Sequence, residues 1–174
     1  MKLRYSIRYF LLFVSVVSLI FFSACDESDT VTLEEQRERD DIIIRDFLEN
    51  NNITNYQRTS SGLYHIPITL GNGESPGIAD SVLVEYTGRF LNGKRFDSSR
   101  FTEEPFTFIV GTGNVISGWE EGIQLMRPGG TSRFIIPSHL AYGSSGRGSI
   151  PGDTVLEFDI ELISFEPSEL SSGN

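Results

Sequence analysis

The sequence predicts one α+β domain, built mostly from antiparallel strands, that follows a hydrophobic leader and a separate helix. The placement of glycine is the first observation: sixteen of the 17 glycines fall between Gly62 and Gly152, and none comes earlier. Periodicity is the second, because a helical pattern over residues 32–50 gives way after Ser60 to an alternation of period two. The length of 174 residues suits one domain with appendages, so we place the domain boundary near residue 60.

Residues 1–24 have the organisation of a secretory signal peptide. Lys2, Arg4 and Arg8 supply positive charge without any acid, and a run of apolar and small residues follows. That run is shorter than the ~20 apolar residues of a membrane-spanning helix. The tripeptide Ser23-Ala24-Cys25 resembles a bacterial lipobox, in which the cysteine is lipidated and becomes the mature N-terminus, although Phe22 replaces the usual leucine. We expect an extracytoplasmic lipoprotein anchored to a membrane of the cell envelope through Cys25, with an uncleaved anchor or plain secretion as alternatives.

An acidic segment follows the cysteine. Cleavage would remove three positive charges and change the net charge from −10 to −13, and residues 26–50 carry ten acids against three arginines. We expect residues 25–59 to be an acidic tether and a helical stalk. The acidic residues directly after Cys25 resemble sorting signals of more than one bacterial system, so the membrane, inner or outer, stays open. Such an acidic chain makes nucleic acid an unsuitable partner, because phosphate binding needs basic patches.

A helix is predicted over residues 32–50. Thr32 and Glu35 have the spacing of a capping box, and the stretch contains neither glycine nor proline. Apolar residues recur four apart, at Ile43 with Phe47 and at Ile44 with Leu48, and predict one apolar stripe. The stripe can rest on the following domain as part of a spacer, or it can join two copies of the chain as a homodimer.

The region after Ser60 contains several strand patterns and one helix. Alternating apolar residues predict strands around residues 82–87 and 156–162, and further strands are predicted at 106–110 and 131–136. Asn92-Gly93 predicts a two-residue hairpin turn. A short helix is predicted over residues 118–126, with Trp119, Ile123 and Met126 facing the sheet and Pro128 ending it. We expect the domain to span residues 60–167 and to be followed by a disordered tail, 168–174.

The chemistry of the domain is not that of a nucleophile or a metal. Cys25 is the only cysteine, His65 and His139 stand alone, and no phosphate-binding loop occurs. We therefore expect no metal site and no cofactor. What remains is a large set of aromatic residues, most of which periodicity alone would assign to the core.

Six segments of the domain, in order and at matching spacing, resemble the FKBP-type peptidyl-prolyl isomerases. They are VEYTGRF (84–90), GKRFDSS (93–99), PFTFIVG (105–111), VISGWEEGI (115–123), AYGSSG (141–146) and IPGDTVLEFDIELI (150–163). The resemblance implies a bent antiparallel half-barrel of five to six strands wrapped around one short helix, with the active site in the hollow between them. It also implies proline-containing polypeptides as substrates, and macrolides as possible inhibitors.

Site residues follow from the resemblance position by position. Trp119 would form the floor under the prolyl ring, Asp97 would be the polar residue of the wall, and the Tyr142 hydroxyl and the Ile116 N–H would donate hydrogen bonds to the substrate backbone. Ile150 would lie on a loop that covers the site. The apolar walls would be formed by Tyr86, Phe96, Phe106, Val115, Ile116 and Phe158.

The sequence departs from the family pattern at Thr102, where a basic partner of Asp97 is common, and Arg100 is a candidate substitute. The loop after Tyr142 is about one residue short, with Arg147 in place of a frequent histidine and Ser149 in place of an apolar residue. The prediction is a peptidyl-prolyl isomerase that acts on proteins folding outside the cytoplasm. The alternative is a module that binds prolyl peptides, or acts as a chaperone, without turnover.

Overall fold

The computed structural model of the protein describes residues 32–99 and 104–169. Predictions that concern the leader, Cys25, Arg100, Thr102 and residues 170–174 lie outside these ranges. The described part begins with helix α2, Leu33–Asn50. Its start is the predicted capping box, in which Glu35 N donates to Thr32 Oγ1 at 3.2 Å and Thr32 N donates to Glu35 Oε2 at 2.8 Å.

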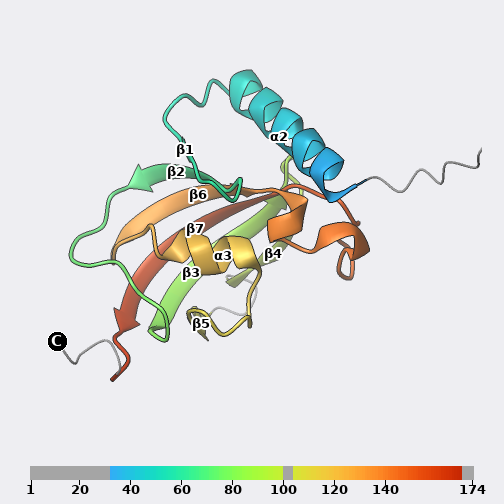
Figure 1. Ribbon diagram of the computed structural model, residues 1–174. Coiled ribbons are helices and arrows are strands. Elements are labelled where there is room, and N and C mark those ends of the chain that lie inside the picture. The colour runs from blue at the N-terminus through green and yellow to red at the C-terminus, as the bar shows by residue number, and fades with distance from the viewer. Residues whose placement is uncertain (1–31, 100–103, 170–174) are drawn as a thin grey trace, which may run out of the picture. The chain divides into compact units, whose positions relative to one another are not determined.

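Seven strands in the described residues form one antiparallel sheet (Figure 1). Its order is β1-β2-β6-β7-β3-β4, and β5 pairs with β3. The long strands β3 and β7 pair over the whole length of β3 and form the centre of the sheet. The strands are β1 (Gln57–Arg58), β2 (Tyr64–Thr69), β3 (Ser81–Phe90), β4 (Arg95–Ser98), β5 (Phe106–Ile109), β6 (Gly130–Ile136) and β7 (Leu156–Glu166).

The predicted α+β architecture, with its antiparallel sheet and preceding helix, is confirmed. The sheet has more than the expected five to six strands for two local reasons. The two-residue strand β1, which lies in the range expected for the stalk, adds to β2. Strands β4 and β5 pair with different parts of β3, with Thr87–Arg89 and Ser81–Val84 respectively, and therefore count separately.

The hairpin between β3 and β4 has a longer loop than the predicted two-residue turn. Phe90 N donates to Lys94 O at 3.0 Å, so that three residues, Leu91 to Gly93, connect the strands. Only Gly93 of these has a positive φ, 83°. A type I turn followed by a left-handed glycine is the usual three-residue hairpin loop.

Helix α3, Ser117–Ile123, packs against the concave face of the sheet (Figure 1). It ends three residues before the predicted Met126, because the following bonds close tighter turns: Leu125 N donates to Gly122 O and Met126 N to Ile123 O. Trp119, Ile123 and Met126 are all buried in the main core, as predicted. The approach of the helix to β6 requires glycine at position 122, where a Cβ would lie 2.9 Å from the Phe134 ring.

Helix α2 covers the opposite face of the sheet. Ile44 and Leu48 are buried with Tyr64, Ile66, Ile135 and Val155 in a second cluster. The main core on the other face contains Phe134 and Ile136, the residues on either side of Ile135 in β6. This is expected, because successive side chains of a strand point to opposite faces of the sheet. The apolar stripe of α2 is thus buried against the sheet of the same chain, whereas Ile43 remains 46% exposed. The third buried member of the stripe is the charged residue Asp40.

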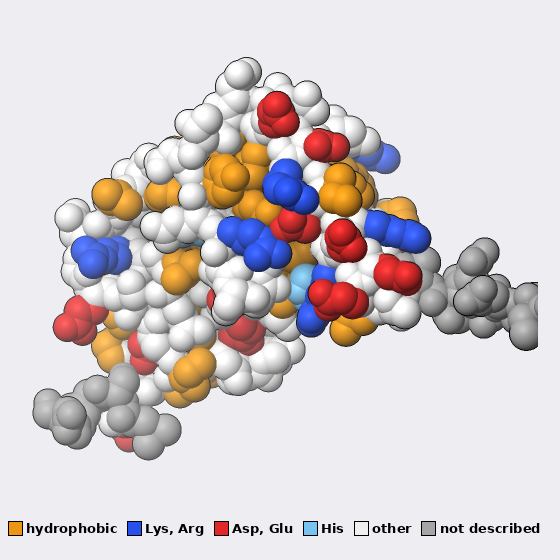
Figure 2. All heavy atoms as spheres, turned by 45° about the horizontal axis from the view of Figure 1, so that its top comes forward, with side chains coloured by type: hydrophobic (Ala, Val, Ile, Leu, Met, Phe, Trp, Pro, Cys, Tyr) orange, Lys and Arg blue, Asp and Glu red, His pale blue; other side chains and the backbone are white. Residues whose placement is uncertain are grey.

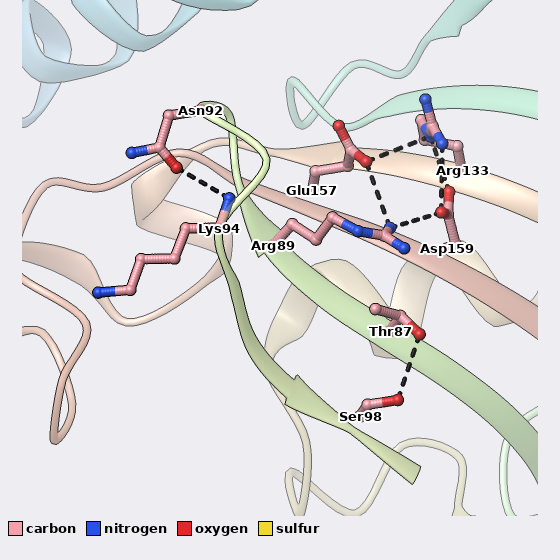
Figure 3. Close-up of polar contacts among 8 residues, drawn as sticks. All are labelled: Thr87, Arg89, Asn92, Lys94, Ser98, Arg133, Glu157 and Asp159. Atoms are coloured by element: carbon pink, nitrogen blue, oxygen red, sulfur yellow. Dashed lines mark hydrogen bonds and ion pairs between the residues drawn. The ribbon is translucent and has the colours of Figure 1, made fainter. Parts of the chain in front are cut away.

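A network of ion pairs lies beside this second cluster on the outer face of the sheet (Figure 3). Arg89 of β3 and Arg133 of β6 both contact Asp159 of β7, at 2.6 and 2.7 Å. Both guanidinium groups also lie within 3.6 Å of Glu157. Burial raises the pKa of Glu157, whereas for Asp159 the two arginines outweigh burial and lower the pKa. The network ties three strands together on the side away from α3.

Among the described residues, no helix is both long enough and apolar enough to cross a membrane. The described residues from Thr32 onward belong to one compact unit. Acidic and basic side chains are interspersed on the surface near the start of α2 (Figure 2).

Candidate active site

A cavity of about 520 Å³ opens between the concave face of the sheet and helix α3. Eight of the ten residues predicted for the site of the domain line it. Five further residues complete the lining: Gly113, Asn114, Ser117, Ala141 and Arg147. The predicted residues that line it are Tyr86, Asp97, Phe106, Val115, Ile116, Trp119, Tyr142 and Phe158.

Trp119 lies at the centre of an aromatic cluster. Its ring centroid is 4.8 Å from that of Tyr86 and 5.3 Å from that of Phe158, and both contacts are edge to face. Phe106 and Phe108 add contacts at 6.2 and 5.9 Å. Helix α3 carries Trp119 and the sheet carries the other four rings, so that the floor of the cavity is formed where helix and sheet meet. Edge-to-face packing of this kind holds rings in fixed orientations.

Tyr86 and Asp97 form the polar side of the wall. The Tyr86 hydroxyl donates to Asp97 Oδ2 at 3.0 Å, and Ser98 N donates to Asp97 Oδ1 at 2.8 Å. Burial raises the pKa of Tyr86, and the hydrogen bond to the Asp97 carboxylate raises it further. Both oxygens of Asp97 are therefore engaged with neighbours on β3 and β4, and Tyr86 remains a protonated donor.

Several hydrogen-bond donors of the residues that line the cavity have no partner among the described residues. They include the hydroxyl of Tyr142, the indole Nε1–H of Trp119 and the N–H of Ile116, the residue that precedes the first turn of α3. Burial raises the pKa of Tyr142, against an opposing effect of the nearby Arg147. The Arg147 guanidinium carbon lies 5.8 Å from the centre of the Tyr142 ring. The cavity therefore combines aromatic surfaces with donors, such as the Tyr142 hydroxyl and the Ile116 N–H, that a bound peptide backbone can satisfy.

Glu120 fixes the loop that forms one wall of the cavity. Its carboxylate accepts hydrogen bonds from Gly111 N and from Gly113 N, the latter at 2.9 Å. Gly111 and Gly113 have φ angles of 83° and 72°, a conformation that favours glycine. The wall residues Gly113 to Ile116 are thereby tied to α3, the helix that also carries Trp119.

Two predicted site residues do not line the cavity. Phe96 packs behind the wall, with its ring centroid 5.0 Å from that of Phe90 and 5.6 Å from that of Phe158. Ile150 is buried in the main core, 8% exposed, at the end of a tight turn in which Arg147 and Ile150 exchange two backbone hydrogen bonds. Gly88 permits the packing of Phe96, since a Cβ there would lie within 2.9 Å of both Phe96 and Phe158.

The sequence patterns did not identify the five additional residues that line the cavity. Glycine, alanine and asparagine contribute backbone and small side chains, which no periodicity distinguishes from ordinary loop residues. Arg147 stood out only as a departure from the family pattern. Glu120 had a local signal, because an acid in the first turn of a helix is placed to accept from nearby backbone N–H groups.

Comparison with known proteins agrees with the geometry. Residues 72–163 match the family model described as FKBP-type peptidyl-prolyl cis-trans isomerase. The FKBP-type isomerase FkpA of Aeromonas hydrophila is 45% identical over 116 residues, which are 67% of this chain and 42% of that protein. FK506-binding protein 4 of Dictyostelium discoideum is 48% identical over 105 residues, 60% of this chain and 28% of that protein. The chain thus matches less than half of the length of either relative.

A solved structure shows the same fold. The crystal structure of FkpA from Escherichia coli superimposes with a TM-score of 0.66 at 33% identity, and the match covers 77% of this chain and 62% of that one. The family model spans more than half of the 174 residues and includes all of the residues that line the cavity. The chain therefore belongs to the FKBP-type peptidyl-prolyl cis-trans isomerase family.

Proposed function

We propose that the protein catalyses the cis–trans isomerisation of X–Pro bonds in polypeptide substrates, by a non-covalent mechanism that uses no cofactor. The observation that carries this proposal is the cavity itself, with Trp119 as an aromatic floor and the unpartnered donors Tyr142 and Ile116 N–H at its edge. A prolyl ring is apolar and flat enough to stack on an indole, whereas the flanking peptide groups need donors.

The physical basis is the barrier to rotation about the amide bond. Rotation costs ~18–20 kcal/mol because resonance is lost when the bond is perpendicular. X–Pro bonds have useful cis populations but exchange in about tens to hundreds of seconds. The twisted amide is less polar than the planar, charge-separated one, so an apolar cavity that excludes water favours it relative to bulk solvent. A site that binds the twisted form more tightly than the planar form accelerates the reaction without a nucleophile.

The polar residues have different roles in this proposal. Tyr142 and the Ile116 N–H would fix the peptide on either side of the proline, so that rotation occurs about one bond. Asp97 would order its neighbours, because Tyr86 and Ser98 N already occupy both of its oxygens. Tyr86 would remain protonated over the whole physiological range of pH, in line with the raised pKa.

We further propose that the clients are proteins folding outside the cytoplasm and that the mature chain is a lipoprotein anchored at Cys25. The support is the charge and hydropathy pattern of residues 1–24 and the lipobox-like Ser23-Ala24-Cys25. Mass spectrometry of the mature N-terminus would test this proposal: a diacylated or triacylated Cys25 supports it, and an intact Met1 contradicts it. The limits of leader, tether, domain and tail remain predictions.

Two partner predictions also remain proposals. Macrolides of the kind that inhibit this family would bind the same cavity.

A homodimer through residues 32–50 would have to use the outer side of α2, since Ile44 and Leu48 are buried within the chain while Leu33, Ile42 and Ile43 are exposed. Sedimentation of the protein before and after Ile42→Glu would test the dimer.

The activity is tested with a protease-coupled assay on tetrapeptides that contain one X–Pro bond, using the full chain. Tyr142→Phe removes one hydroxyl from the cavity and should lower kcat/KM by about tenfold. The matched control Tyr56→Phe, at a residue that packs on Tyr64 and does not line the cavity, should not change it. Peptide binding without any rate above background would instead select the non-catalytic binding module.

A further inference from the structure

Asp40 is a buried carboxylate that the proposed reaction does not use. It lies on the inner stripe of α2, four residues before Ile44 and eight before Leu48, and is 0% exposed. Burying a charged group is costly unless hydrogen bonds replace its water. An apolar residue at this position could pack against the sheet without that cost. A carboxylate here is therefore expected to have a specific hydrogen-bond partner.

That partner is Ser138, 98 residues further along the chain. Asp40 Oδ2 accepts from both the backbone N–H and the hydroxyl of Ser138, each at 2.7 Å, and Gln36 Nε2 donates to Asp40 Oδ1 at 2.9 Å. Ser138 begins the short 3₁₀ helix η2, Ser138–Leu140. Pro137 precedes it and has no side-chain group to accept the first N–H. Asp40 therefore supplies, from another helix, the cap that η2 lacks.

The segment that Asp40 caps leads directly to the cavity. Ala141 N donates to Ser138 O at 3.0 Å, and Ala141 and Tyr142 both line the cavity. His139 Nε2 is 2.9 Å from Ser61 O, a second anchor on the same turn. The chain from β6 into η2 passes beside the first turns of α2 (Figure 1). Tyr142, which carries the hydroxyl donor, comes only four positions after Ser138, which the carboxylate contacts.

We propose that Asp40 is a positioning residue of the isomerase site: by holding Ser138, it sets the position of Tyr142. Helix α2 then belongs to the active unit and is more than a spacer between anchor and domain. The inference rests on the proposed function, because it assigns to Asp40 an effect on that activity. Asp40 touches no substrate and acts through Tyr142 alone.

The first measurement compares Asp40→Ala and Asp40→Asn with the control Asp46→Ala, an exposed acid on the same helix. All are made in the full chain and assayed below their unfolding temperatures. Asp40→Ala should lower kcat/KM by about five- to tenfold, and Asp46→Ala should leave it unchanged. Asp40→Asn keeps one acceptor oxygen for Ser138 and should recover part of the lost kcat/KM. The recovery should be incomplete, because hydrogen bonds to an ionised acceptor are about twice as strong as those to a neutral one.

The second measurement is a double-mutant cycle with Tyr142→Phe. If Asp40 acts by positioning the Tyr142 hydroxyl, adding Asp40→Ala to Tyr142→Phe should lower kcat/KM by less than a further factor of about two. If Asp40 has a purely structural role, the loss of kcat/KM in the double variant should equal the product of the two single losses, and that result overturns the proposal. Should Asp40→Ala fail to fold, Ser138→Ala replaces it in the cycle, because it removes only the hydroxyl contact and keeps the backbone one.

Amide hydrogen exchange separates this inference from the proposed function. Asp40→Ala should raise exchange at residues 138–142 and leave the centre of the sheet, β3 and β7, unchanged. This readout needs no activity, so an inactive wild-type chain refutes the isomerase proposal without deciding the inference. Unchanged exchange at residues 138–142 in Asp40→Ala overturns the inference even if the wild type is active.

Discussion

Tyr86 and Trp119 meet edge to face, with ring centroids 4.8 Å apart and ring planes at 80°. The contact joins the centre of the sheet to helix α3 at the floor of the cavity. Since Tyr86 also donates to Asp97, one residue links the aromatic floor to the polar wall. Changes at the floor should therefore affect both the stability of the fold and the reaction.

Trp119→Ala should destabilise the protein by about 3–5 kcal/mol, because the indole is only 5% exposed and its removal leaves a large hole under the cavity. Trp119→Phe keeps an aromatic surface and should cost less in both stability and kcat/KM. Urea unfolding followed by circular dichroism measures the first effect, and the isomerase assay on the folded fraction measures the second. An alanine variant with full activity would show that the floor does not contact the prolyl ring.

Gly88→Ala should change the shape of the cavity from behind. Its Cβ would lie 2.7 Å from Phe158 and 2.8 Å from Phe96, so that the rings have to move. Overpacking of this kind costs about 1–3 kcal/mol, and a displaced Phe158 should narrow the cavity and raise KM. Gly77→Ala is the control, because its Cβ would find ordinary space near Asp80. Equal effects of the two substitutions would contradict this packing.

Arg147 should favour substrates with an acidic residue next to proline. Its guanidinium lies at the exposed wall of the cavity, above the Tyr142 ring. Exposed charge pairs contribute ~0.2–1 kcal/mol, which corresponds to about one- to fivefold in kcat/KM. The ratio of kcat/KM for Glu-Pro and Lys-Pro peptides should fall in Arg147→Gln and also in high salt. The same ratio in wild type and Arg147→Gln would refute this specificity role.

His65 should make stability sensitive to mild acid. The side chain is 7% exposed, stacks on Phe134 at 5.0 Å, and contacts Ser132 Oγ through Nε2 at 2.9 Å. Burial lowers the pKa of His65 below the usual 6.5, so the folded state resists protonation while the unfolded state takes up a proton. The free energy of unfolding should therefore fall as pH drops below about 6.5, and the fall should level off below the folded pKa.

The measurement for His65 is denaturant unfolding at pH 7.5 and pH 5 in wild type and His65→Gln. Glutamine keeps a polar group near Ser132 but does not titrate, so the loss between the two pH values should be smaller in the variant. Carboxylates with lowered pKa values, such as Asp159, lose their contribution only at more acidic pH. Glu157, whose pKa is raised by burial, favours the folded state as pH falls, so the comparison of wild type with His65→Gln isolates the histidine. Identical losses would contradict the assignment.

Much of the fold could be predicted because it is encoded locally. Thr32 and Glu35 form their capping box within four residues, and the alternating residues 156–162 all lie in the one strand β7. The aromatic lining was predicted from the family resemblance, whose segments carry the rings. These features depend on neighbours in sequence or on a known pattern.

The missed features depend on contacts between distant residues. Asp40 has the same spacing as Ile44 and Leu48, yet a charged residue at that place gives no sign of burial until its partner Ser138 is known. Asp41 likewise accepts from Tyr64 at 2.7 Å and from Arg58 at 2.8 Å, both outside α2. Docking of α2 on the sheet therefore depends on polar pairs as well as on the apolar stripe, and periodicity detects only the stripe.

The most direct test of the central claim is exchange spectroscopy by NMR on an X–Pro tetrapeptide with a small fraction of the full chain. Without a catalyst, cis and trans signals exchange in about tens to hundreds of seconds and give no cross peaks on a one-second timescale. We predict cis–trans cross peaks in the presence of the protein and their marked loss with Tyr142→Phe. Peptide signals that shift on binding but show no cross peaks would contradict catalysis and leave a binding module.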